Sequence, residues 1–175
     1  MTKQMIAVVF MASVGLSGIV GAHEAPTMKP GSPELQQIKQ LVGKWQGMST
    51  PMGTNEKPGP VSTEFRLTAM GSAIEENLMK GSPEEMVDMY TDEGGKLAMT
   101  HYCAMGNQPH MVLKSAGPHQ VSLEMVPTVG IDPNSSHMHS LSLEFADANH
   151  LTERWTNYKS GKPSETVVFN LTRVK

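Results

Sequence analysis

The feature that most constrains the fold is a period-two alternation of apolar and polar residues, which runs from Trp45 nearly to the end of the chain. Side chains at every second position of a β-strand lie on one face, so each alternating stretch predicts a strand with one buried face. Together the stretches predict about nine or ten strands. They lie at 45–49, 61–67, 74–79, 84–91, 97–105, 110–115, 121–125, 137–145, 151–157 and 167–171.

Short turns connect most of these predicted strands, and no helical pattern lies between them. The turns at 92–95, 116–118, 146–149 and 160–163 are typical of hairpins, whereas 51–60 and 127–136 are longer loops. Successive hairpins predict an antiparallel meander, and closing it into a barrel removes its edges. We therefore predict a mainly β fold, an antiparallel up-and-down lipocalin-like barrel, with a two-sheet sandwich as the alternative. A barrel of this size has an interior suited to a small ligand.

One short helix is predicted before the strands. Ser32 is a favoured N-cap, Pro33 suits the first helical position, and Glu34 places an acid in the first turn. The following apolar residues share one helical face as far as Gly43, where the helix is expected to end. We expect this helix to cap or plug the larger β-structure.

The N-terminal segment has the pattern of a secretory signal peptide over residues 1–22. A basic start is followed by an apolar run and by the small residues Gly21 and Ala22. We expect residues 23–31 to be a flexible arm and residues 32–175 to form a single domain. The pattern predicts a bacterial periplasmic or secreted protein, with no membrane span after cleavage because no second apolar stretch is long enough.

The composition excludes one class of partner and sets the character of the core. The formal net charge is −3 without a Lys/Arg cluster, which argues against nucleic-acid binding. The chain has 15 methionines but only nine aromatic residues, so flexible Met side chains are expected to fill a lean core. Cys103 is the only cysteine, so the chain has no internal disulfide.

Three of the alternating faces also carry chemically versatile polar side chains. Because the apolar members of a face point inward, the polar members are expected inside the barrel too. Buried polar groups are costly unless they find partners, so this cluster predicts either an internal hydrogen-bond network or a ligand site. The candidate ligand-binding residues are His101, Cys103, His137, His139, Glu153 and Trp155, with Asn107 and Gln108 at the rim.

Three functions fit this set, and the first is preferred. It is the binding of a small-molecule ligand, without a defined cofactor, inside the barrel or at its rim. The second is a copper or zinc site, because imidazole, thiolate and thioether groups bind these metals. The third is a hydrolase or transferase with Cys103 as nucleophile. Residues two apart on a strand are about 6.5–7 Å apart, so a His from another strand is expected to activate Cys103.

Two motifs resemble a family of exported bacterial proteins that is grouped as a domain of unknown function. The first runs from Thr100 to Pro109 and contains the sequence His-Tyr-Cys followed by Gly-Asn-Gln-Pro. The second contains the His-Met-His of 137–139 and extends to Lys162, and the Leu-Val-Gly-Lys-Trp of 41–45 is also similar. The resemblance implies a lipocalin-like, or calycin-like, barrel and no settled activity. His110 stands where the family usually has Arg, and no haem-ligand motif of the related nitrobindin-type barrels is present.

Overall fold

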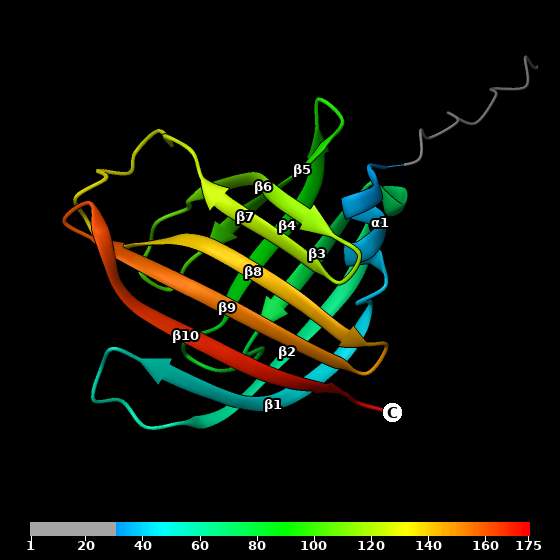
Figure 1. Cartoon of the computed structure of the whole chain (residues 1–175), viewed down its shortest axis with the longest axis horizontal. Helices are drawn as coiled ribbons and strands as arrows, with labels where there is room; N and C mark the ends of the chain where they lie inside the picture. Colours follow the sequence, from blue (N-terminus) through cyan, green and yellow to red (C-terminus); the bar gives the residue numbers. More distant parts are fainter. Residues whose placement is uncertain (1–30) are drawn as a thin grey trace, which may run out of the picture.

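Ten antiparallel strands close into a barrel in the computed structural model, which describes residues 31–175. Each strand pairs with its neighbours in sequence, and β1 pairs with β10 to complete the ring (Figure 1). The predicted fold class is therefore confirmed and the sandwich alternative is wrong. The predicted signal peptide and residues 23–30 of the predicted arm lie outside the described residues. No helix in the described part of the chain has the length and apolar character needed to span a membrane.

Strands make up most of the described backbone, and the helical elements are short. A seven-residue helix, α1, precedes the barrel, and one turn of 3-10 helix, η1, lies between β2 and β3. Their bounds are α1 Pro33–Lys39, β1 Gly43–Met52, β2 Gly59–Thr68, η1 Ala69–Gly71, β3 Ala73–Leu78, β4 Met86–Glu93, β5 Lys96–Tyr102, β6 His110–Gly117, β7 Gln120–Met125, β8 His137–Asp147, β9 His150–Lys159 and β10 Lys162–Arg173.

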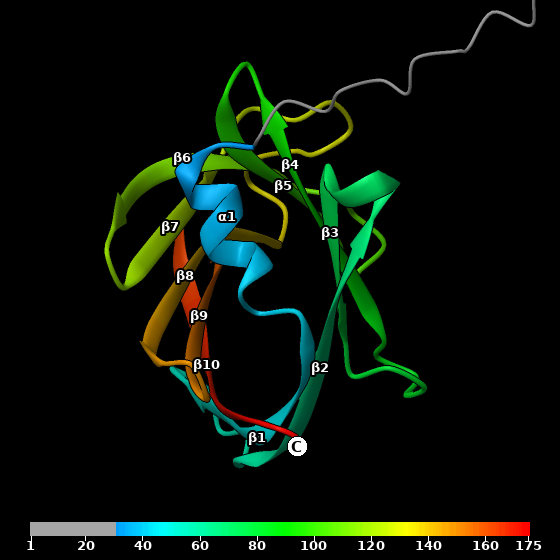
Figure 2. The ribbon, with the colours of Figure 1, turned by 90° about the vertical axis from the view of Figure 1, so that its right-hand side faces the viewer.

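Helix α1 covers one end of the barrel, as expected from its apolar face. Leu35 and Ile38 are fully buried in the same core as the strands, and Figure 2 shows the helix across the barrel opening. Ser32 caps the helix, accepting a hydrogen bond from the Leu35 amide while its hydroxyl donates to Asp92 of β4. The helix ends at Lys39, earlier than predicted, because Gly43 already begins β1.

Arg173 fixes the end of β10 to the helix. Its guanidinium lies 4.2 Å above the ring of Trp45 and donates hydrogen bonds to the backbone carbonyls of Gln40, Val42 and Ala148. The Trp45 indole in turn donates to the Leu41 carbonyl at 2.7 Å. One side chain therefore joins the last strand, the segment that follows α1, and the turn between β8 and β9.

The first and last strands approach one another closely at Gly47. A Cβ atom at this position would lie 1.8 Å from the carbonyl oxygen of Asn170. Only glycine fits this approach, so Gly47 permits the pairing of β1 with β10 that closes the barrel.

Candidate functional site

A layer of polar side chains crosses the interior of the barrel. Its centre is a pair formed by Asp88 of β4 and His101 of β5, which lie opposite each other in the register of the two strands. Asp88 Oδ1 is 2.6 Å from His101 Nδ1, and both side chains are buried. A carboxylate can only accept, so Nδ1 carries the proton and the remaining imidazole nitrogen, Nε2, points elsewhere.

Two glutamates extend the layer around this pair. Glu76 of β3 accepts hydrogen bonds from the hydroxyls of Thr63 and Tyr90, at 2.8 and 2.7 Å. Glu153 of β9 accepts a hydrogen bond from the indole of Trp155 at 3.1 Å. Both glutamates are completely buried. The Trp155 ring links Glu153 to the Asp88–His101 pair, because the centre of this ring is 4.9 Å from that of His101.

Burial and mutual charge shift the pKa values across the layer. Burial alone lowers the pKa of His101, but the charge and hydrogen bond of Asp88 overcome this and raise it to about 10. His101 is therefore an imidazolium at neutral pH. Burial raises the pKa of Glu153 to about 7. Burial and the charges of Glu153 and Asp88 raise the pKa of Glu76 well above its usual value.

His101 also lines a small, mainly apolar cavity. Its Nε2 atom is buried and has no hydrogen-bond partner among the described residues. His101 and Trp155 line a cavity of about 170 Å³ inside the barrel. The rest of its wall is mainly Met, Leu, Val and Phe: Leu78, Met79, Met86, Met138, Val167 and Phe169, with Ser49. The cavity thus combines an apolar wall with one charged hydrogen-bond donor.

The predicted face of His101, Cys103 and Met105 is broken, because β5 ends at Tyr102. The Gly106 amide donates to the Cys103 carbonyl in a tight turn, and Gly106 has a φ of 79°. Met105 is consequently exposed, and the expectation that it shares the inner face is wrong. Cys103 stays buried beside the layer. Burial raises its pKa, but the His101 side chain and the Met105 backbone amide together lower it below its usual value.

The two rim amides have structural contacts. The Asn107 side chain donates to the Ser136 carbonyl at 2.9 Å, which ties the 103–109 turn to the 127–136 loop. The Gln108 amide makes a long 3.4 Å contact within its own turn and is exposed. Neither residue lines the cavity inside the barrel.

His137 and His139 do not face the interior, which corrects the predicted common site. A β-bulge between Met138 and Ser140 inserts one residue into β8. For residues on the N-terminal side of the bulge, the inward and outward positions are therefore exchanged relative to the alternation counted back from Leu141. Met138 therefore lines the inner cavity, and the two histidines lie outside under the 127–136 loop. A shared metal site of His101, Cys103 and these histidines is excluded. Within residues 31–175, no group of three or more His, Cys, Asp or Glu side chains is arranged to hold a metal ion.

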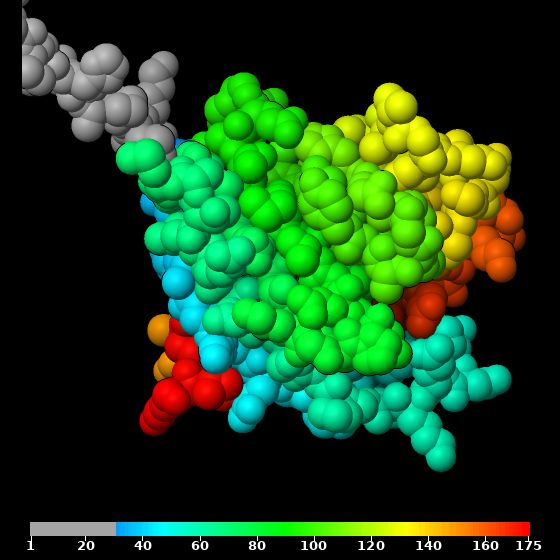
Figure 3. All heavy atoms as spheres, turned by 180° about the vertical axis from the view of Figure 1, so that it is seen from behind, coloured from blue at the N-terminus to red at the C-terminus, as the bar shows by residue number. Residues whose placement is uncertain are grey.

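The histidines line a groove of about 510 Å³ together with Tyr158. The loop that covers it bulges outward beside the turn between β9 and β10 (Figure 3, yellow beside orange). The Ser160 amide donates to the Asn134 carbonyl across this contact. The outer groove and the inner cavity have no lining residue in common.

Sequence reasoning missed Asp88, Glu76 and Tyr90. The facing of 74–79 and 84–91 was ambiguous because methionine occurs on both faces of the second stretch, at Met86 and Met89. A signal was present nonetheless. Asp88 lies two residues before Tyr90 and therefore on the same face, and a single acid on an apolar face needs a buried partner.

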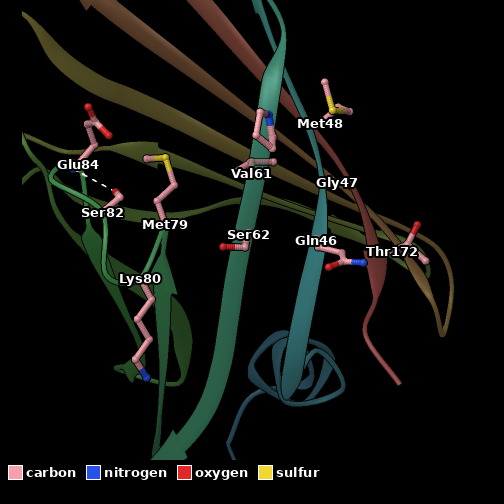
Figure 4. A pocket seen from close by; sticks show the side chains of 11 residues that line it. Gln46, Gly47, Met48, Val61, Ser62, Met79, Lys80, Ser82, Glu84 and Thr172 are labelled. Carbon is pink, nitrogen blue, oxygen red and sulfur yellow. Dashed lines mark hydrogen bonds between the residues drawn. The ribbon is translucent and has the colours of Figure 1, made fainter.

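A larger hollow, about 760 Å³, is a surface groove beside the β3–β4 turn (Figure 4). Gln46, Ser62 and Thr172 line one side, and Lys80 and Glu84 lie across from them. Both charged residues are exposed, so the groove lacks a desolvated polar group. The inner cavity is therefore the better candidate site, although it is smaller.

Comparison with known proteins supports the fold. No protein-family model matches the chain, and no curated protein matches it. Among solved structures, it is similar to a protein of unknown function from the DUF3598 family of Nostoc punctiforme, with a TM-score of 0.57 and 14% identity over 79% of this chain. The chain spans about half of that protein, 49% of its length. It is also similar to Rv2717c from M. tuberculosis, with a TM-score of 0.57, 15% identity, and coverage of 83% of this chain and 100% of that one.

Proposed function

We propose that this protein is an exported β-barrel that binds a small, mostly apolar molecule in the cavity beside His101. The observation that carries the proposal is the buried, unpartnered Nε2 of His101 at an apolar wall. A buried polar group without a partner costs free energy, and a ligand acceptor would remove that cost. The signal-like pattern of residues 1–22 supports export, which N-terminal sequencing of the mature protein tests by its start at His23.

The charges indicate a neutral ligand with a carbonyl-type oxygen. As an imidazolium, His101 can donate a hydrogen bond from Nε2–H to a ligand oxygen, but its positive charge is already balanced by Asp88. A full anion would therefore gain no net countercharge from His101. The volume is suitable for a single ring, since an apolar cavity of about 150 Å³ is known to accommodate benzene.

Acetophenone and ethylbenzene form a matched pair of probes, because they differ in one carbonyl oxygen. We expect acetophenone to bind roughly tenfold or more tightly in calorimetric titration, since a hydrogen bond to a charged donor contributes about 1.5–3 kcal/mol. His101→Phe is expected to abolish this preference, and His139→Gln, in the outer groove, to retain it. Equal binding of both probes by the unaltered protein, or no binding of either, contradicts the proposal.

A nucleophilic role for Cys103 is the second candidate. Asp88 contacts His101, and the His101 side chain lowers the pKa of Cys103 against the opposing effect of burial. His101 therefore takes the activating role that was expected of a His from another strand. We expect iodoacetamide to alkylate Cys103 faster at pH 7 in the unaltered protein than in His101→Phe. Equal alkylation rates would leave the thiol with a packing role only.

A further inference from the structure

The outer groove contains two imidazole nitrogens that approach each other within the distance typical of metal ligands. His137 Nε2 lies 3.2 Å from His139 Nδ1. Two nitrogens that bind one tetrahedral ion at about 2.0–2.1 Å lie about 3.3 Å apart. Both rings are held in place, because His137 is buried and His139 stacks on Tyr158 with 3.7 Å between ring centres.

Two neutral imidazoles leave one nitrogen of the pair without a proton beside a carboxylate. His137 Nδ1 lies 2.9 Å from the Ser135 carbonyl and so carries a proton, which leaves Nε2 of a neutral ring as an acceptor. His139 must then donate from Nδ1 to His137. Its own Nε2, without a proton, faces the carboxylate of Glu124 at 3.8 Å. Two acceptors therefore face each other at the far side of His139.

We propose that His137 Nε2 and His139 Nδ1 bind a transition-metal ion that prefers imidazole, Cu²⁺ or Zn²⁺, in the outer groove. The ion would take the place of the Nδ1 proton of His139, and that proton would move to Nε2 of the same ring and point to Glu124. His137 would then donate to a carbonyl and His139 to a carboxylate, which is the usual outer shell of metal-binding histidines. The 510 Å³ groove leaves room for water or an added ligand in the remaining positions.

The test is a titration of the untagged full chain, freed of metal, with Cu²⁺ and with Zn²⁺ in competition with a chromophoric chelator. We expect one site that binds Cu²⁺ more tightly than Zn²⁺. The electron paramagnetic resonance spectrum of the Cu²⁺ form should show coupling to two nitrogen nuclei. His139→Gln should weaken binding at least about a hundredfold without unfolding, because the side chain is only partly buried.

Glu124→Gln tests the outer shell and should weaken binding about 10–100-fold. Glu144→Gln on β8 and His119→Gln are matched controls, since both side chains are exposed and lie outside the groove, and binding should not change. No binding of either ion overturns the proposal, as does equal binding by the unaltered protein and His139→Gln. These outcomes are independent of the inner cavity, because the probes of that cavity require His101 and not His139.

Discussion

Asp88 and His101 form a buried pair, with 2.6 Å between Oδ1 and Nδ1, that fixes the orientation of the imidazole ring inside the barrel. The Nδ1 proton is committed to the carboxylate, so Nε2 is the only nitrogen that His101 can offer to a ligand. The pair also determines the charge of the ring, because Asp88 is the first group that opposes the effect of burial on the pKa of His101.

Replacing Asp88 by Asn should lower the pKa of His101 from about 10, because the amide keeps the shape of the side chain and loses its charge. Titration of the imidazole resonances by NMR measures the change. Glu93→Gln is the control on the same strand, because Glu93 contacts His110 and not His101. A pKa of His101 that stays near 10 in Asp88→Asn would show that Asp88 is not its cause.

The stability of the barrel should fall as the pH rises. Glu153 has a folded-state pKa of about 7, above its unfolded value near 4.5, so its deprotonation favours the unfolded chain between those pH values. His101 is raised from 6.5 to about 10, so the stability it contributes is present below pH 6.5 and is lost toward pH 10. Urea unfolding from pH 5 to 9 should show a steady decrease in midpoint. In Glu153→Gln, the decrease in the urea midpoint below pH 7 should become smaller, and the decrease above pH 7 should remain. A midpoint independent of pH in the unaltered protein would contradict the raised pKa values of both Glu153 and His101.

Arg173→Ala should destabilise the protein by about 1–3 kcal/mol, because it removes three carbonyl contacts and the stacking on Trp45. Arg173→Lys should recover only part of this, since a compact ammonium group cannot reach three separate carbonyls while a planar face lies over the Trp45 ring. The urea midpoint measures both variants. Full recovery by lysine would mean that charge alone, not the planar guanidinium, joins the strand to the helix end.

Gly47→Ala should be among the most damaging single-methyl additions in the barrel. The new Cβ meets the Asn170 carbonyl at 1.8 Å, so β1 and β10 must separate, at a cost of about 1–3 kcal/mol or more. Gly59→Ala is the matched control, because a Cβ there meets nothing within 4 Å and should change stability by less than about 0.5 kcal/mol. Thermal unfolding of the two variants compares them directly, and similar midpoints would argue against a tight β1–β10 contact.

Alternation in the sequence was sufficient to predict the barrel because most strands have one apolar face and most are joined by short turns. The inward positions of His101, Glu153 and Trp155 followed from the same rule, and all three are buried. The candidate site was only partly predictable. Asp88 pairs with His101 through strand register, and register between strands has no local sequence signal.

The errors occur where the backbone departs from regular pleating. The bulge at His139 and the turn after Tyr102 each change which face a side chain occupies, although the residue types still alternate. Gly106 and Pro109 were signs of the second departure, whereas the first has no comparable residue. The alternation of apolar and polar side chains therefore predicted the core better than it predicted the positions of His137 and His139.

The bulge in β8 has a consequence for how the protein can change over evolution. It lets one strand supply Met138 to the interior and His139 to the exterior, with the sheet between them. The two hollows have different lining residues, so a substitution can alter one while leaving the other intact. If the same residues paired regularly, the alternation that begins at Leu141 would place His139 inside and Met138 outside, so the bulge itself, more than any one side chain, keeps the two sets apart.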